Sequence, residues 1–128
     1  MVKNKDGITI VVIDDEPDIL TIFETALTHA GYAVKAFSSP DKALEFFKVN
    51  HGSCPLVVSD IRMQGMNGLM LAREVKRIAP DTKIILMSGF EINLSEYEKV
   101  FPSTKIESIL DKPISMRKFV EAIERQLM

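Results

Sequence analysis

Side chains that can bind cations or phosphate follow four separate apolar segments of the chain. They are Asp14 and Asp15 after residues 8–13, Asp60 after residues 55–59, Ser88 after residues 82–87, and Lys112 after residues 106–110. Carboxylates held close together repel one another unless a cation compensates, and Mg²⁺ with oxygen ligands is the usual compensating ion. If the fold gathers these groups, the site could hold a dianionic phosphoryl group beside carboxylates that would otherwise repel it.

Each of these groups also has an ordinary structural explanation. Asp14 and Asp15 come shortly before Pro17, so they suit the first turn and the dipole of a helix. Ser88 precedes a glycine and could belong to a simple turn, and Lys112 could be a solvated lysine. Only their joint position at the ends of strands favours a shared site.

The hydrophobic pattern predicts five β-strands that alternate with helices. Short apolar runs predict strands at residues 8–13, 33–37, 55–59, 82–87 and 106–110. The first helix ends at Gly31, the second begins at Pro40, the third ends before Pro80, the fourth lies around residues 94–101, and the fifth begins near Ser115. Such alternation predicts a parallel sheet with helices on both faces and right-handed connections.

The polarity of the strands predicts their order. The first, third and fourth are almost wholly apolar, as expected for strands buried on both faces. The second contains Lys35 and the fifth contains Glu107 and Ser108, which predicts that these two lie at the edges. The order 2-1-3-4-5 satisfies this, and it puts the ends of the first and third strands, with Asp14 and Asp60, at the point where ligands bind in such sheets.

Length and composition limit the classes of protein. The 128 residues predict a single domain, 1–128, with a core over about residues 8–127. The net charge is −2 and neither half is strongly basic, so we expect no direct nucleic-acid binding. No apolar run approaches the roughly 20 residues that cross a membrane. Cys54 is the only cysteine and the N-terminus has no apolar signal segment, so we expect a buried thiol and a cytoplasmic protein.

The motifs together resemble the receiver domain of two-component response regulators, over essentially the whole chain. The matching segments are residues 10–17 (IVVIDDEP), 60–68 (DIRMQGMNG), Ser88-Gly89 and Lys112-Pro113. The resemblance implies an α/β fold, the flavodoxin-like three-layer (β/α)5 sandwich of the chemotaxis regulators. It also implies a phosphoprotein in a phosphorelay that catalyses only its own phosphoryl transfer and dephosphorylation, and is not otherwise an enzyme.

The same resemblance implies a role for each site residue. Asp60 would be the phosphoacceptor, Lys112 and Ser88 would contact the phosphoryl oxygens, and Ser88 with position 109 would form the switch. The metal ligands would be Asp14, Asp15, Asp60 and the main-chain carbonyl of Arg62, for Mg²⁺ or Mn²⁺ as a substitute. The Lys112-Pro113 peptide would be cis. A histidine kinase or phosphotransfer protein would supply the phosphoryl group, and an output protein would bind the face of the fourth helix, fifth strand and fifth helix.

Several positions depart from the family pattern. Gln64 stands where the family usually has proline, and Ile109 stands where it usually has the tyrosine or phenylalanine that moves with the switch hydroxyl. Isoleucine has no ring to rotate and is stiff at χ1. Phe90 or Tyr97 could supply an aromatic group instead. The segment before the fifth strand, residues 101–105, also lacks the usual family sequence.

Three alternatives remain at this stage. A degenerate receiver could act as a constitutive docking module that never takes phosphate; Ile109 favours this slightly, whereas the complete set of acidic, hydroxyl and lysine residues argues against it. A flavin-binding protein of the same fold would need a Ser/Thr/Gly-rich loop where this chain has residues 14–16. An Asp-x-Asp phosphatase would need aspartate where Glu16 stands.

Overall fold

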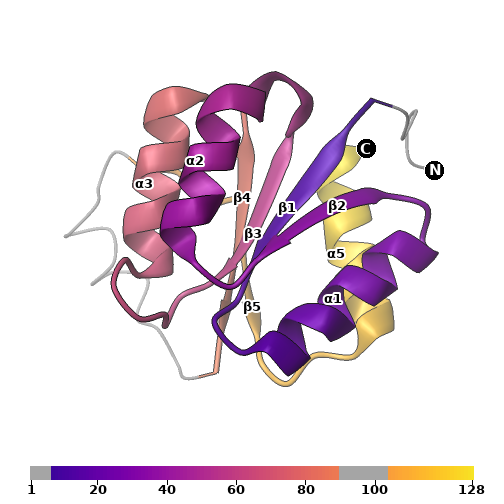
Figure 1. Cartoon of the computed structure of the whole chain (residues 1–128). Helices are drawn as coiled ribbons and strands as arrows, with labels where there is room; N and C mark the ends of the chain where they lie inside the picture. Colours follow the sequence, from indigo (N-terminus) through magenta and orange to yellow (C-terminus); the bar gives the residue numbers. More distant parts are fainter. Residues whose placement is uncertain (1–6, 90–103) are drawn as a thin grey trace.

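The computed structural model describes residues 7–89 and 104–128, which form one parallel sheet with helices on both faces (Figure 1). The strands lie in the order β2-β1-β3-β4-β5, as predicted. They are β1 (Thr9–Ile13), β2 (Ala33–Phe37), β3 (Leu56–Asp60), β4 (Lys83–Ser88) and β5 (Ser108–Asp111). This is the flavodoxin-like architecture that the resemblance implied.

Two helices cover each face of the sheet in the described part of the chain. The helices are α1 (Pro17–His29), α2 (Pro40–Asn50), α3 (Gly68–Ile78) and α5 (Met116–Leu127), with a short 3-10 helix η1 (His51–Ser53). Figure 1 shows α1 and α5 on one face and α2 and α3 on the other. The helix predicted around residues 94–101 lies outside the described residues, as do Phe90 and Tyr97.

Local sequence signals explain where the helices begin. The side chains of Ser39, Asn67 and Ser115 accept hydrogen bonds from main-chain N–H groups in the first turns of α2, α3 and α5. Helix α1 has no such side-chain cap, but Pro17 is at its first position and Asp18 is in its first turn. None of the helices in the described ranges is both long and apolar enough to cross a membrane.

The core forms two layers, one on each face of the sheet. Alternate residues of β1, β3 and β4 pack against α2 and α3, and the others pack against α1 and α5. On the second face the rings of Phe23 and Phe119 stack with centroids 4.4 Å apart, which joins α1 to α5. The central strands are therefore buried on both faces, as their near-continuous apolar sequences predict.

The predicted strand boundaries need small corrections. Asp60 and Ser88 are the last residues of β3 and β4, whereas the sequence placed both just after their strands. Strand β5 begins at Ser108, two residues later than predicted, and it extends to Asp111. The polarity of these residues led to the error, because strand pairing continues through side chains that a hydropathy pattern reads as loop.

Gly68 permits the close approach of α3 to the end of β3. Its N–H donates to the Ile61 carbonyl at 2.8 Å, and a Cβ added at Gly68 would lie 2.3 Å from the main-chain oxygen of Asp60. Backbone atoms cannot rotate out of the way as a long side chain can. A side chain at position 68 would therefore push α3 away from the strand that carries Asp60.

We expect Gly68→Ala to lower the free energy of unfolding by about 1–3 kcal/mol or more, the cost of overpacking a tight site. Urea denaturation measures the change. Gly52→Ala is the matched control, because nothing lies within 4 Å of a Cβ there. Equal urea midpoints for the two variants would contradict the argument.

Candidate functional site

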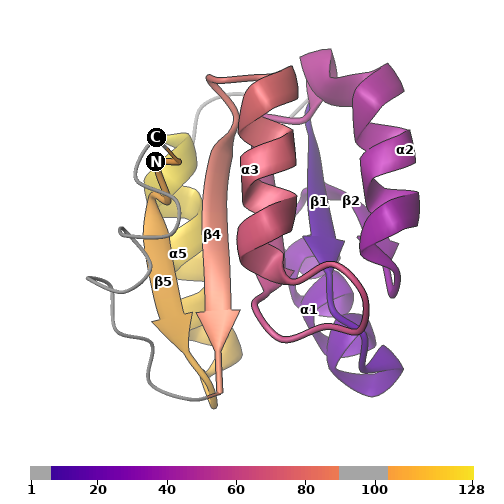
Figure 2. The same cartoon turned by 90° about the vertical axis from the view of Figure 1, so that its left-hand side faces the viewer.

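The carboxyl ends of four strands bring the predicted site residues to one edge of the sheet. Asp14 follows β1 directly, Asp60 and Ser88 end β3 and β4, and Lys112 follows β5. Because all the strands are parallel, their carboxyl ends lie at the same edge; Figure 2 shows this for β4 and β5. The sheet order puts β1 and β3 side by side, so residues 46 positions apart in the sequence become neighbours.

Three carboxylates converge at this edge. One oxygen from each of Asp14, Asp15 and Asp60 lies within 4.8 Å of the others. Asp14 is fully buried, Asp60 is 7% exposed and Asp15 is half-buried. Mg²⁺ and Mn²⁺ prefer hard oxygen ligands, so these three carboxylates fit either ion.

Lys112 lies between two of these carboxylates. Its Nζ is 3.0 Å from Oδ2 of Asp14 and 3.4 Å from Oδ2 of Asp60, and its side chain is 19% exposed. Burial by itself would lower the pKa of Lys112, but the hydrogen bond and charge of Asp14, with the charge of Asp60, outweigh it and raise that pKa. The amine is therefore held as an ammonium ion at the centre of the site.

Both the carboxylate and the main-chain N–H of Asp14 make hydrogen bonds. Its Oδ1 accepts a hydrogen bond from the Glu16 N–H at 2.9 Å, while its Oδ2 accepts from Lys112. Its own N–H donates to the Phe37 carbonyl at 3.1 Å, which anchors it to the end of β2. Asp15 is the more accessible of the adjacent pair.

The surroundings of Asp60 disfavour the charged form of its carboxyl group. Burial raises the pKa of this carboxyl, the charge of Lys112 lowers it, and the charge of Asp14 raises it again; the balance leaves the pKa raised. One ammonium group thus does not fully offset the buried carboxylates. An added cation would lower the electrostatic cost of this arrangement.

The other predicted residues lie around this cluster. Ser88 is 6% exposed and pairs in register with Asp111, and its carbonyl accepts from the Lys112 N–H at 2.7 Å. Arg62, with an exposed side chain, lines a surface hollow that Asp15 and Gln64 also line. The Lys112-Pro113 peptide bond is cis, the form that the resemblance implied.

Ile109 lies on β5, three residues before Lys112. It is half-buried, pairs in register with Leu86 and packs against the core on the α2–α3 face. The sequence did not predict the close contacts that the structure shows at Gly68 and Glu107. The unusual proximity of Gly68 to Asp60 could be anticipated only from the fold, since glycine is common in loops.

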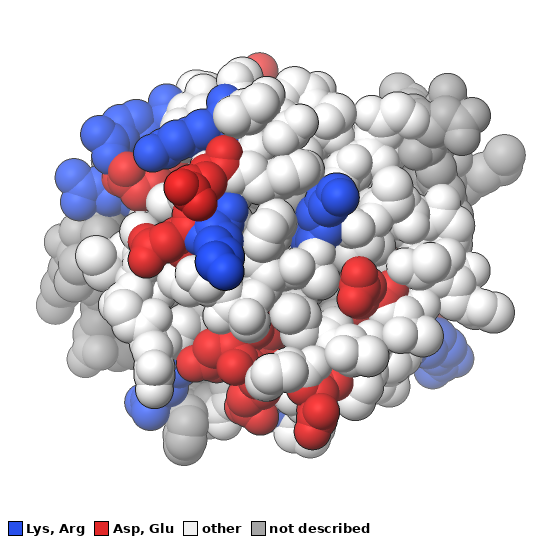
Figure 3. Space-filling model, viewed as in Figure 1, with Lys and Arg blue, Asp and Glu red and all other residues white. Residues whose placement is uncertain are grey.

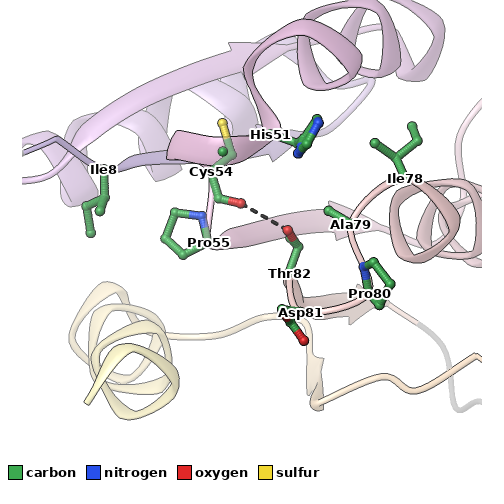
Figure 4. Close-up of a pocket in the computed structure, with 10 residues that line it drawn as sticks. Ile8, His51, Cys54, Pro55, Ile78, Ala79, Pro80, Asp81 and Thr82 are labelled. Carbon is green, nitrogen blue, oxygen red and sulfur yellow. Dashed lines mark hydrogen bonds between the residues drawn. The ribbon is translucent and has the colours of Figure 1, made fainter.

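A second hollow at the opposite edge of the sheet gathers no comparable set of groups (Figure 4). There the Thr82 hydroxyl donates to the Cys54 carbonyl at 3.2 Å, so these polar atoms pair with each other. Cys54 is fully buried, as predicted, and burial raises the pKa of its thiol. A buried thiol with a raised pKa is a poor nucleophile.

The face shown in Figure 3 carries charged side chains of both signs. On the face shown in Figure 3, basic side chains over α2 and α3 are interspersed with acidic ones, and acidic groups gather near the start of α1. A basic stripe that would attract a phosphate backbone is therefore not a feature of this face.

In the absence of metal, Asp60→Asn should stabilise the protein at neutral pH. The raised pKa means that the folded state binds a proton at Asp60 more tightly than the unfolded state does. The stability from this group is therefore greatest below the ordinary carboxyl pKa and is lost as the pH rises through the raised value. Thermal unfolding with a chelator should show a gain from Asp60→Asn that shrinks as the pH is lowered through that window.

The exposed Asp41, in the first turn of α2, provides the control. Asp41→Asn should give no gain at neutral pH. A gain from Asp60→Asn that stays constant down to acid pH would show that charge at position 60 is not its source.

Comparisons with known proteins agree with this geometry. The family described as the response regulator receiver domain matches residues 10–124. The chain is 31% identical over 119 residues to the response regulator receiver protein CpdR of Brucella abortus, covering 93% of this chain and 96% of that protein. It is 29% identical over 119 residues to the sensor kinase CckA of the same species, where it spans 93% of this chain but only 12% of the kinase.

A solved structure supports the same assignment. The response regulator protein TrrA from Thermotoga maritima is 30% identical, with a TM-score of 0.77 over 94% of this chain and 99% of that one. The strand order, the three converging carboxylates and the family match agree with one another. The chain belongs to the family of response regulator receiver domains of two-component systems.

Proposed function

We propose that Asp60 of this receiver domain accepts a phosphoryl group in a Mg²⁺-dependent reaction, from a histidine kinase or a phosphotransfer protein. The observation that carries the proposal is the placement of the Lys112 ammonium 3.0 Å from Asp14 and 3.4 Å from Asp60, beside three converging carboxylate oxygens. The TrrA structure is a complex with Mg²⁺-BeF, which supports a site for a divalent cation and a compact anionic group.

The chemistry assigns one step to each residue. A carboxylate oxygen of Asp60 attacks phosphorus, a new P–O bond forms, and the P–N bond of the phosphohistidine donor breaks; the imidazole leaves and takes up a proton. The Lys112 ammonium neutralises one phosphoryl oxygen and the Ser88 hydroxyl donates to another. Asp14, Asp15, Asp60 and the Arg62 carbonyl would hold Mg²⁺, which would supply further positive charge beside the phosphoryl oxygens.

The phosphorylated state differs from the free state by new hydrogen-bond acceptors at one point. These acceptors can draw Ser88 and Lys112 inward, and that differential bonding can bias a two-state surface. The output surface we propose includes β5 and α5, with a protein partner that reads the change. We propose that the domain catalyses only its own phosphorylation and dephosphorylation, with no other enzymatic activity. We propose the cytoplasm as its compartment.

The alternative of a docking module that never takes phosphate is less well supported. Such a module has no need to keep Asp14, Asp60 and Lys112 in mutual contact, since their burial costs free energy. The half-buried Ile109 bears on the size of the switch, and it does not bear on the chemistry at Asp60.

We expect one phosphoryl group to be added to the protein by a small phosphoramidate donor when Mg²⁺ or Mn²⁺ is present. Asp60→Asn should reduce incorporation to background. Asp15→Ala should raise the Mg²⁺ concentration needed for half-maximal phosphorylation by at least about tenfold, since even residues that only support metal ligands change metal affinity by about 10–100-fold. Intact-mass spectrometry measures the yield.

The control is Asp41→Asn, which changes an exposed aspartate on α2. This variant should be phosphorylated to the same yield as the wild type. Wild-type yield in Asp60→Asn would mean that another residue is the acceptor. Equal yield with and without a chelator would remove the metal from the proposal.

Ile109→Tyr should enlarge the response of β4 and β5 to phosphorylation. A ring can alternate between two packed positions, whereas Ile109 already fills one half-buried position against the core. Shifting the populations of two conformational states from 1:99 to 99:1 requires about 5.5 kcal/mol of differential stabilisation. A packing difference of roughly 1 kcal/mol between the two states would therefore change the size of the response measurably. Hydrogen exchange before and after phosphorylation measures the response.

Ile109→Leu adds no ring and should respond as the wild type does. If Ile109→Tyr also gives the wild-type response, position 109 does not limit the switch, and Phe90 is then the next residue to test.

A further inference from the structure

Glu107 makes an unusually complete set of contacts just before β5. Its Oε1 accepts a hydrogen bond from the Ile84 N–H at 2.7 Å, and both of its carboxylate oxygens lie 3.1 Å from Nζ of Lys76. Its own N–H donates to the Ile84 carbonyl at 3.0 Å. The side chains of Lys76 and Glu107 are only 14% and 11% exposed. The sequence had predicted that Glu107 is simply a polar residue of an edge strand.

The Glu107 carboxylate takes the place of a strand carbonyl. The N–H of Lys83 donates toward β3, to the Pro55 carbonyl, so the next N–H along β4, that of Ile84, points toward β5. Its acceptor is the Glu107 side chain. Strand pairing between β4 and β5 therefore begins with a side-chain contact that Lys76, in the last turn of α3, holds in place.

This contact lies just before β5, and Lys112 directly follows the same strand. Among the described strands, β5 has a neighbour on one side only; it spans four residues and has no fully buried residue. A slip of one residue along β4 would move Lys112 by about 3.3 Å and turn its side chain to the other face. The distances of Lys112 from Asp14 and Asp60 could not survive such a slip.

We propose that the Lys76–Glu107 pair is a positioning device that fixes the register of β5 and thereby holds Lys112 at the phosphorylation site. Buried ion pairs often add little to stability, yet they can select one register over another. Here the pair joins α3, β4 and β5 at the amino end of the sheet, while the Lys112 N–H bonds to the Ser88 carbonyl at the carboxyl end. The edge strand is thus fixed at both ends. The consequence for phosphorylation depends on the function proposed above for Lys112.

The test compares Glu107→Ala with Glu107→Gln, which keeps an acceptor for the Ile84 N–H. Val34→Ala, a half-buried position on the opposite edge strand β2, controls for loss of stability alone. One readout is the rate of phosphorylation by a small donor at saturating Mg²⁺. The other is the rate at which an acylating reagent modifies Lys112, followed by peptide mass spectrometry, which requires no phosphorylation.

We expect Glu107→Ala to slow phosphorylation by about 10–100-fold, because a displacement of an ångström or more at a reacting site has effects of that size. Acylation of Lys112 should become severalfold faster in the folded Glu107→Ala variant. In Glu107→Gln, both the phosphorylation rate and the acylation rate should return part of the way to the wild-type values. Val34→Ala should change neither rate. A folded Glu107→Ala that matches Val34→Ala in both rates would overturn the positioning role.

Two further outcomes are informative. If the wild type takes no phosphate, the proposed function fails, and the Lys112 acylation rates still decide whether Glu107 positions that lysine. If Glu107→Ala does not fold, Glu107→Gln and Lys76→Met replace it. Wild-type acylation of Lys112 in both of these variants would overturn the proposal.

Discussion

Two aspartates lie almost out of contact with water at one edge of this sheet, and a single ammonium group lies between them. Asp14 and Asp60 are 0% and 7% exposed, and Lys112 is within 3.4 Å of both. Taking these charges out of water costs free energy, which the mutual attraction of the three groups only partly offsets. The raised pKa of Asp60 records the remaining imbalance. A cation bound at this edge would reduce the same imbalance, which is the basis of the Mg²⁺-dependent phosphorylation that we propose.

The rest of the fold keeps these groups in contact. Asp14 is anchored through the Phe37 carbonyl to β2, and Asp60 lies on a strand against which α3 packs directly through Gly68. Lys112 directly follows β5, an edge strand of the described sheet that has no fully buried residue. The Lys76–Glu107 pair lies far from the acidic cluster, yet by fixing β5 it bears on the same charge balance. In this proposal, the register of β5 determines both the contacts of Glu107 at the amino end of the sheet and the position of Lys112 at the carboxyl end.

The departures from the family pattern fall outside this charged centre. Gln64 lines the hollow next to Asp15, where a missing proline leaves φ unrestricted. Ile109 faces the α2–α3 core layer and pairs with Leu86. In the described residues, the ion pairs of the Lys112 amine are with Asp14 and Asp60. Under the proposed function, the chemistry at Asp60 and the transmission of its result could therefore vary separately.

The sequence alone determined the class of fold and the strand order, and it predicted which polar residues meet at the carboxyl ends of the strands. Apolar runs that are buried on both faces differ visibly from edge strands, and polar residues at strand ends must meet when the strands are parallel. Only the tertiary structure decided how these residues share charge, since the distances from Lys112 to Asp14 and Asp60 depend on packing between segments about 50 to 100 residues apart. It also decided the role of Glu107. A glutamate in an edge strand has the same sequence pattern whether it faces water or replaces a main-chain carbonyl, and the choice depends on Lys76 and Ile84, which reach it from α3 and β4.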